Sequence, residues 1–138
     1  MPTMIRHLAL RVADLPRSRA FYEHGLGLRF VGYRPSGSAV DLSDGTLNVT
    51  LLPYAGPPRQ SLDEGDEYIH FGVIVDDHVA TFERLRALGA TFLRSDVKTR
   101  DPLDPARPPQ GSFKVADPDG NVVDVTPHRD EWRGVRLD

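Results

Sequence analysis

Two stretches of the chain share one pattern of hydrophobic and polar positions. HLALRVAD begins at His7 and HFGVIVDD begins at His70, and each has His first, a small residue third, Val sixth and Asp eighth. The alternation of side chains along both stretches is typical of a β-strand with one buried face. Because the pattern occurs twice, the chain is predicted to contain two copies of one structural unit.

A helical pattern follows each of these strands. The sequence predicts helices over 14–26 and 77–88, each beginning at an Asp and continuing with apolar residues at helical spacing. Both patterns end at Leu-Gly, and glycine suits the left-handed conformation found at the end of a helix. Strand-like segments come next, LRFVGY from Leu28 and TFLRSDV from Thr91.

Each copy closes with a hairpin. Asp44-Gly45 precedes TLNVTLL in the first copy, and Asp119-Gly120 precedes NVVDVT in the second. Asp-Gly between strand-like segments is a strong signal for a tight turn. Each half therefore reads as a strand, a helix and three further strands.

The repeats predict the organisation of the chain as one domain over 1–138. We expect a first module over about 4–52, a linker over 53–67, a second module over about 68–126 and a tail over 127–138. The tail carries Trp132 and can fold back, and the proline-rich loop over 101–111 is long enough to form a lid or rim.

An α+β fold follows from this organisation. A single module cannot cover its own sheet face, so the two tandem βαβββ modules should pair into an open, cupped mixed sheet with the helices outside. The concave face of that sheet is then the predicted site.

Composition narrows the chemistry of such a site. The 138 residues include no cysteine, which excludes disulfides, thiolate nucleophiles and zinc sites built on sulfur. The net charge of -3, with acidic and basic residues interspersed, argues against a nucleic-acid binder or a polybasic membrane anchor. No apolar run approaches the roughly 18–20 residues that cross a bilayer, so we expect a cytoplasmic protein that binds a small molecule.

Four polar side chains are predicted to point into the cup. Alternation along the strands places His7, Asn48, His70 and Asp124 on the face opposite the apolar residues. Two imidazoles and one carboxylate, His7, His70 and Asp124, form a ligand set for a divalent Fe, Mn, Ni, Co or Zn ion. Each residue alone could instead be a core histidine or a turn-capping aspartate. Asn48 has a weak, neutral oxygen, which favours a supporting or substrate-facing role.

The motifs HLALRVADLPRSRAFY, LGL, HFGVIVDD and DPDGNVVDV resemble those of the vicinal oxygen chelate superfamily. This superfamily includes glyoxalase I, extradiol dioxygenases, and fosfomycin and bleomycin resistance proteins, and the resemblance covers Met4 to Thr126. It implies the glyoxalase/bleomycin resistance/dihydroxybiphenyl dioxygenase fold, commonly completed as a homodimer. The family's metal positions correspond to His7, Asn48, His70 and Asp124.

Two of these positions depart from glyoxalase I. The positions of Asn48 and Asp124 are normally Glu there, and Asn48 cannot accept a proton at neutral pH. Arg11 matches a first-strand arginine that holds an anionic part of glutathione, which implies an anionic substrate; a salt bridge at the rim is the alternative for Arg11.

The resemblance and the ligand set together predict a metal-dependent enzyme. It would act on a small substrate through two vicinal oxygens, with Arg11 and Asn48 as substrate-binding residues. Either a metal-bound hydroxide or Asp124 would be the base. Glyoxalase-like lyase or isomerase chemistry is favoured over extradiol dioxygenase chemistry. A binding or resistance protein without catalysis is the third alternative.

Overall fold

The same order of elements occurs twice along the chain, in agreement with the predicted repeat. The computed structural model describes residues 3–59, 65–93 and 106–137. The first module contains β1 (His7–Val12), α1 (Leu15–Ala20), the π-helix η1 (Phe21–Gly25), β2 (Arg29–Tyr33), β3 (Val40–Ser43) and β4 (Asn48–Pro53). The second contains β5 (Phe71–Ile74), α2 (His78–Ala87), β6 (Thr91–Phe92), β7 (Phe113–Ala116) and β8 (Val122–Thr126).

Some predicted segments fall outside the described residues. These are 60–64 of the linker, 94–97 of the strand predicted from Thr91, and 101–105 of the loop predicted as a lid or rim.

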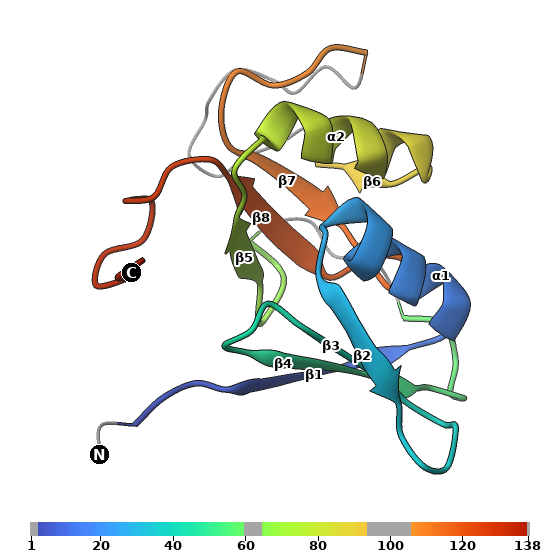
Figure 1. Ribbon diagram of the computed structural model, residues 1–138. Helices are drawn as coiled ribbons and strands as arrows, with labels where there is room; N and C mark the ends of the chain where they lie inside the picture. The colour runs from blue at the N-terminus through green and yellow to red at the C-terminus, as the bar shows by residue number, and fades with distance from the viewer. Residues whose placement is uncertain (1–2, 60–64, 94–105, 138) are drawn as a thin grey trace.

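Each module forms a four-stranded mixed sheet (Figure 1). The strand orders are β1-β4-β3-β2 and β5-β8-β7-β6. In each module, the first strand therefore lies at an edge of the sheet and pairs with the last strand. These two strands run parallel, and the remaining neighbours run antiparallel. The parallel pairing sets the register that matters for the site, because His7 lies opposite Asn48 and Gly72 lies opposite Asp124.

Both helices begin at the predicted aspartates. Asp14 accepts a hydrogen bond from the backbone N–H of Arg17, and Asp77 accepts one from that of Ala80. Such caps satisfy backbone donors that have no partner within the helix. No helix among the described residues is long and apolar enough to cross a membrane.

The predicted first helix is not one continuous α-helix. The α-helical part ends at Ala20 and the wider turn η1 follows, in which Leu26 N–H donates to the carbonyl of Phe21 at 2.9 Å. This wider turn buries the adjacent rings of Phe21 and Tyr22, which are 3% and 0% exposed. Packing against both rings explains why the helical pattern changes at this point.

One hydrophobic core serves both modules. Residues of the two sheets and of the helical segments belong to a single buried cluster, including Leu42, Leu51, Phe82, Leu85 and Val123. The helical segments meet closely, since a Cβ on Gly25 would lie 2.6 Å from Cδ2 of Leu85. Burial of the shared core is what each module lacks by itself.

The turn between β7 and β8 fastens the second module to the first. The hydroxyl of Tyr22 donates to Asp117 Oδ2 at 2.6 Å, and the backbone N–H of Ala13 donates to Asp119 Oδ1 at 2.9 Å. Asp117 is 4% exposed. Burial, together with the charge of Asp117, raises the pKa of Tyr22 well above its usual value and keeps the phenol protonated as the donor.

The Tyr22→Phe variant tests this attachment. It removes the hydroxyl donor and leaves a buried carboxylate with one hydrogen bond fewer, so the free energy of unfolding should fall by about 1–2 kcal/mol. Urea denaturation followed by circular dichroism measures the change. Tyr68→Phe is the matched control, because Tyr68 is 100% exposed and its loss of a hydroxyl should change stability by less than about 0.5 kcal/mol. Equal stabilities of the two variants would contradict the role of Tyr22.

Candidate metal centre

His7 and Asn48 form the first part of the candidate site. They are partners on the parallel strands β1 and β4, and His7 Nδ1 lies 2.6 Å from Asn48 Oδ1. An amide oxygen only accepts hydrogen bonds, so the proton of the neutral His7 ring is on Nδ1. The lone pair is then on Nε2, the atom that is available as a metal ligand.

Asp41 determines the orientation of the Asn48 amide. Asn48 Nδ2 donates to Asp41 Oδ1 at 3.1 Å, and Thr50 Oγ1 donates to the same oxygen at 2.8 Å. Burial tends to raise the pKa of Asp41, but hydrogen bonds from Arg34, Thr50 and Asn48 outweigh it and hold this pKa below its usual range. The ionised carboxylate attracts the amide nitrogen, which turns the amide oxygen of Asn48 toward His7.

His70 and Asp124 form the second part. His70 Nε2 lies 3.4 Å from Asp124 Oδ2, and His70 Nδ1 lies 3.1 Å from Glu67 Oε1. Hydrogen bonds from its own backbone N–H, from His70 and from the N–H of Gly65 lower the pKa of Glu67. The ionised Glu67 accepts the proton of Nδ1, so Nε2 of His70 is presented beside Asp124.

Lys114 pairs with the other carboxylate oxygen of Asp124. The two residues are partners on β7 and β8, and Lys114 Nζ forms an ion pair with Asp124 Oδ1. Their side chains are 14% and 16% exposed, so this pair is shielded from much of the solvent. Asp124 therefore has Oδ1 toward the ammonium group and Oδ2 toward His70.

Sequence reasoning missed Asp41, Glu67 and Lys114. Asp41 and Lys114 do carry a signal, since each is a polar residue alternating with buried residues in VDLS and FKVA. Glu67 lies in the predicted linker, where an acidic residue is ordinary. What Asp41 and Lys114 contact becomes clear only from the pairing of the strands.

Among the described residues, the group around His7 and the group around His70 do not form one metal site within a single chain. Across residues 3–59, 65–93 and 106–137, no three His, Asp or Glu side chains are close enough together to hold a metal ion. We call the group of His7, Asn48 and Asp41 the first half-site. The second half-site is the group of His70, Asp124 and Glu67. The donor atoms fit a divalent metal, because both imidazoles have Nδ1 engaged and Nε2 presented and a carboxylate oxygen lies beside one of them.

Arg11 shares the exposed face of β1 with His7, as predicted. It lies opposite Leu52, four residues along the strand from His7. No ion pair joins Arg11 to an acidic residue in the part of the chain that the structure describes, so the alternative of a rim salt bridge finds no support there.

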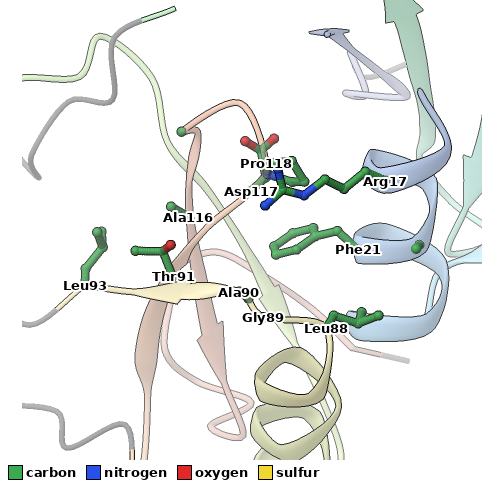
Figure 2. Close-up of a pocket in the computed structure, with 12 residues that line it drawn as sticks. Arg17, Phe21, Leu88, Gly89, Ala90, Thr91, Leu93, Ala116, Asp117 and Pro118 are labelled. Carbon is green, nitrogen blue, oxygen red and sulfur yellow. The ribbon is translucent and has the colours of Figure 1, made fainter. Parts of the chain in front are cut away.

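A pocket of about 290 Å³ lies elsewhere on the molecule (Figure 2). It is bounded by α1, the end of α2, β6 and the turn after β7, with Arg17, Phe21, Leu88 and Asp117 in its lining. None of His7, Arg11, Asn48, His70 and Asp124 lines it. The candidate metal centre is therefore on a different surface.

The sequence model of the Glyoxalase/Bleomycin resistance protein/Dioxygenase superfamily matches residues 4–125. The chain belongs to this superfamily. The resemblance of the motifs and the predicted fold of two tandem βαβββ modules are thereby confirmed.

Curated relatives within the superfamily align over nearly the whole chain. Lactoylglutathione lyase of Salmonella typhimurium is 28% identical, in an alignment that covers 94% of this chain and 96% of the relative. That of Haemophilus influenzae is 29% identical and covers 95% and 97%.

Solved structures of the superfamily share the fold. The fosfomycin resistance protein FosX from Listeria monocytogenes has a TM-score of 0.66 with 19% identity, covering 96% of this chain and 97% of that one. FosX from Mesorhizobium loti has a TM-score of 0.65 with 18% identity, covering 93% and 94%. Oxidase ChaP-H2 has a TM-score of 0.65 with 20% identity, covering 93% and 95%.

The lowered pKa of Asp41 predicts a pH dependence of stability. In the folded state this carboxyl keeps its charge to lower pH than in the unfolded chain, so the unfolded chain binds more protons between the two pKa values. The stability it contributes is full above the unfolded pKa of about 4 and is lost as the pH falls through the folded value.

The Asp41→Asn variant should lose this part of the acid dependence. Urea unfolding between about pH 5 and 2 should show a shallower fall for Asp41→Asn than for the parent. The exposed Asp76 provides the control variant Asp76→Asn, which should follow the parent. Parallel curves for all three proteins would contradict the account of Asp41.

Proposed function

We propose that the protein is a divalent-metal-dependent enzyme acting on a small substrate through two vicinal oxygens. His7 of one protomer, with His70 and Asp124 of its partner, would hold the ion in a homodimer that joins the two kinds of half-site. The observation that carries this proposal is that the two imidazoles are hydrogen-bonded through the same ring nitrogen. Asn48 and Glu67 engage the two Nδ1 atoms, which presents both Nε2 atoms as ligands.

The metal, when bound, would supply Lewis-acid stabilisation of negative charge on a substrate oxygen. The protein's own residues would transfer the proton and orient the substrate. Asp124 can hold or move a proton at Oδ2, because Lys114 engages Oδ1. Arg11 lies on the exposed face that carries His7 and can orient an anionic group of the substrate.

Lyase or isomerase chemistry is the favoured reaction class. The relatives named lactoylglutathione lyase align with almost the entire chain. A proton would be removed from one carbon of the substrate and returned to its neighbour. Since Asn48 lacks the basicity of a carboxylate, Asp124 is the candidate base among the proposed ligands.

An extradiol-type dioxygenase is the second candidate. The observation that favours it is the contact of Asn48 Oδ1 with His7 Nδ1, because an amide engaged in this way supports a ligand instead of serving as one. Two histidines and one carboxylate then remain, which is the set that suits a non-haem iron site.

Metal content provides the first test. Purified parent protein loaded with Mn, Fe, Co, Ni or Zn should retain about one ion per chain after desalting, as measured by elemental analysis. His7→Ala and His70→Ala should each lose most of this metal. The control is His24→Ala, because the His24 side chain is 70% exposed and belongs to neither half-site. A parent that retains none of the five metals would refute the proposal.

Mixing the two histidine variants tests whether the site is shared between protomers. In a heterodimer of His7→Ala and His70→Ala chains, one site would receive both intact histidines and the other would receive neither. Refolding an equimolar mixture should therefore restore about a quarter of the parent's metal, if the chains pair at random. Metal retention no higher than that of the separate variants would show that the site is not shared in this way.

The reaction class is tested by two assays on the metal-loaded protein. Disappearance of hemithioacetals followed by absorbance, without oxygen uptake, is expected for lyase or isomerase chemistry. Oxygen consumption with catechols would replace this assignment with the dioxygenase. Binding of either compound without turnover would favour a sequestering or resistance protein.

A further inference from the structure

The C-terminal tail places an aromatic ring on the second half-site. A Cβ on Gly72 would lie 2.4 Å from both Cη2 and Cζ2 of Trp132, and 3.1 Å from Cβ of Asp124. Gly72 and Asp124 are partners on the parallel strands β5 and β8. Figure 1 shows the tail leaving β8 and running past β5 on the side away from the two helices. The indole therefore lies on the face that carries the proposed metal ligands.

The close approach explains why position 72 is glycine. The backbone of Gly72 is not in the left-handed region, so conformational freedom is not the reason. Any larger residue would place its Cβ where the edge of the indole lies, and the ring would have to move. Gly72 and Trp132 thus act as a matched pair.

Short-range hydrogen bonds hold the tail in position. His128 N–H donates to Thr126 Oγ1 at 3.1 Å, Glu131 N–H donates to the His128 carbonyl at 3.3 Å, and Val135 N–H donates to the Trp132 carbonyl at 3.3 Å. Trp132 is half-buried in this arrangement. Part of Trp132 consequently remains accessible, and its large, flat ring lies beside Gly72, the strand partner of Asp124.

We propose that Trp132 is a substrate-contacting residue that determines specificity, by selecting molecules in which a flat apolar group is attached next to the two vicinal oxygens. This inference rests on the proposed metal function. An indole face favours stacking with another planar group, whereas the neighbouring charges of Asp124 and Lys114 suit the polar end of the substrate. The contact is made by the chain's own tail, so it belongs to the same protomer as the second half-site.

Two hydroxamates provide matched probes. Both present a pair of vicinal oxygens to a metal, but benzohydroxamate adds a planar ring where acetohydroxamate has a methyl group. The cobalt-loaded parent should bind benzohydroxamate about five- to tenfold more tightly than acetohydroxamate, as measured by calorimetry. Trp132→Leu, which keeps an apolar side chain without a planar face, should remove this preference by weakening benzohydroxamate binding. Trp132→Phe should retain most of it.

Fluorescence tests the placement of the ring independently of any metal. Trp132 is the only tryptophan in the chain, so the emission of the metal-free protein reports this contact alone. Gly72→Ala should shift the emission to longer wavelength as the indole is displaced into water. The matched control is Gly32→Ala, because no atom lies within 4 Å of a Cβ at that position, and its emission should equal the parent's.

The outcomes separate the two proposals. If the hydroxamate preference persists in Trp132→Leu, or if Gly72→Ala leaves the emission unchanged, the role of Trp132 is refuted and the metal proposal stands. If the cobalt-loaded parent binds neither hydroxamate, the proposed metal function fails, and the role of Trp132 in that function fails with it.

Discussion

The rest of the structure depends on the hydrophobic core that the two modules share, and the buried hydrogen bond between Tyr22 and Asp117 joins η1 of the first module to the turn after β7 of the second. Each module has only one sheet and one short helical layer, so neither can bury enough apolar surface alone. The turn that contains Asp117 and Asp119 attaches to the first helical segment through side-chain oxygens. This attachment positions β8, and hence Asp124, relative to the first module.

The two half-sites use different residues to fix the tautomer of a histidine. A histidine ligates a metal well only when its other ring nitrogen is engaged and its tautomer is fixed. In the first half-site an amide does this, and a carboxylate behind it sets the direction of the amide. In the second, the carboxylate of Glu67 contacts the ring directly. The internal repeat therefore preserves the positions of the proposed ligands, while their supporting residues differ.

Charge is distributed unequally between the half-sites. Asp41 is balanced by Arg34, whereas Lys114 contacts the proposed ligand Asp124 itself. The second half-site also receives Trp132 from the tail, and the first module has no equivalent segment after β4 among the described residues. Under the proposed function, chemistry and substrate selection would be concentrated on the second module, and the first would supply a histidine and the exposed Arg11.

The sequence by itself determined the repeated strand and helix order and the faces on which His7, Arg11, Asn48 and Asp124 lie, because side-chain alternation and capping are local properties. It did not determine that the first helix widens at Phe21, since that depends on packing against the second module. Nor could it place Glu67 against His70, because that local contact depends on the backbone conformation of an irregular segment. It also could not place Trp132 against Gly72, because the two residues are far apart in the sequence and only the tertiary structure decides that they meet.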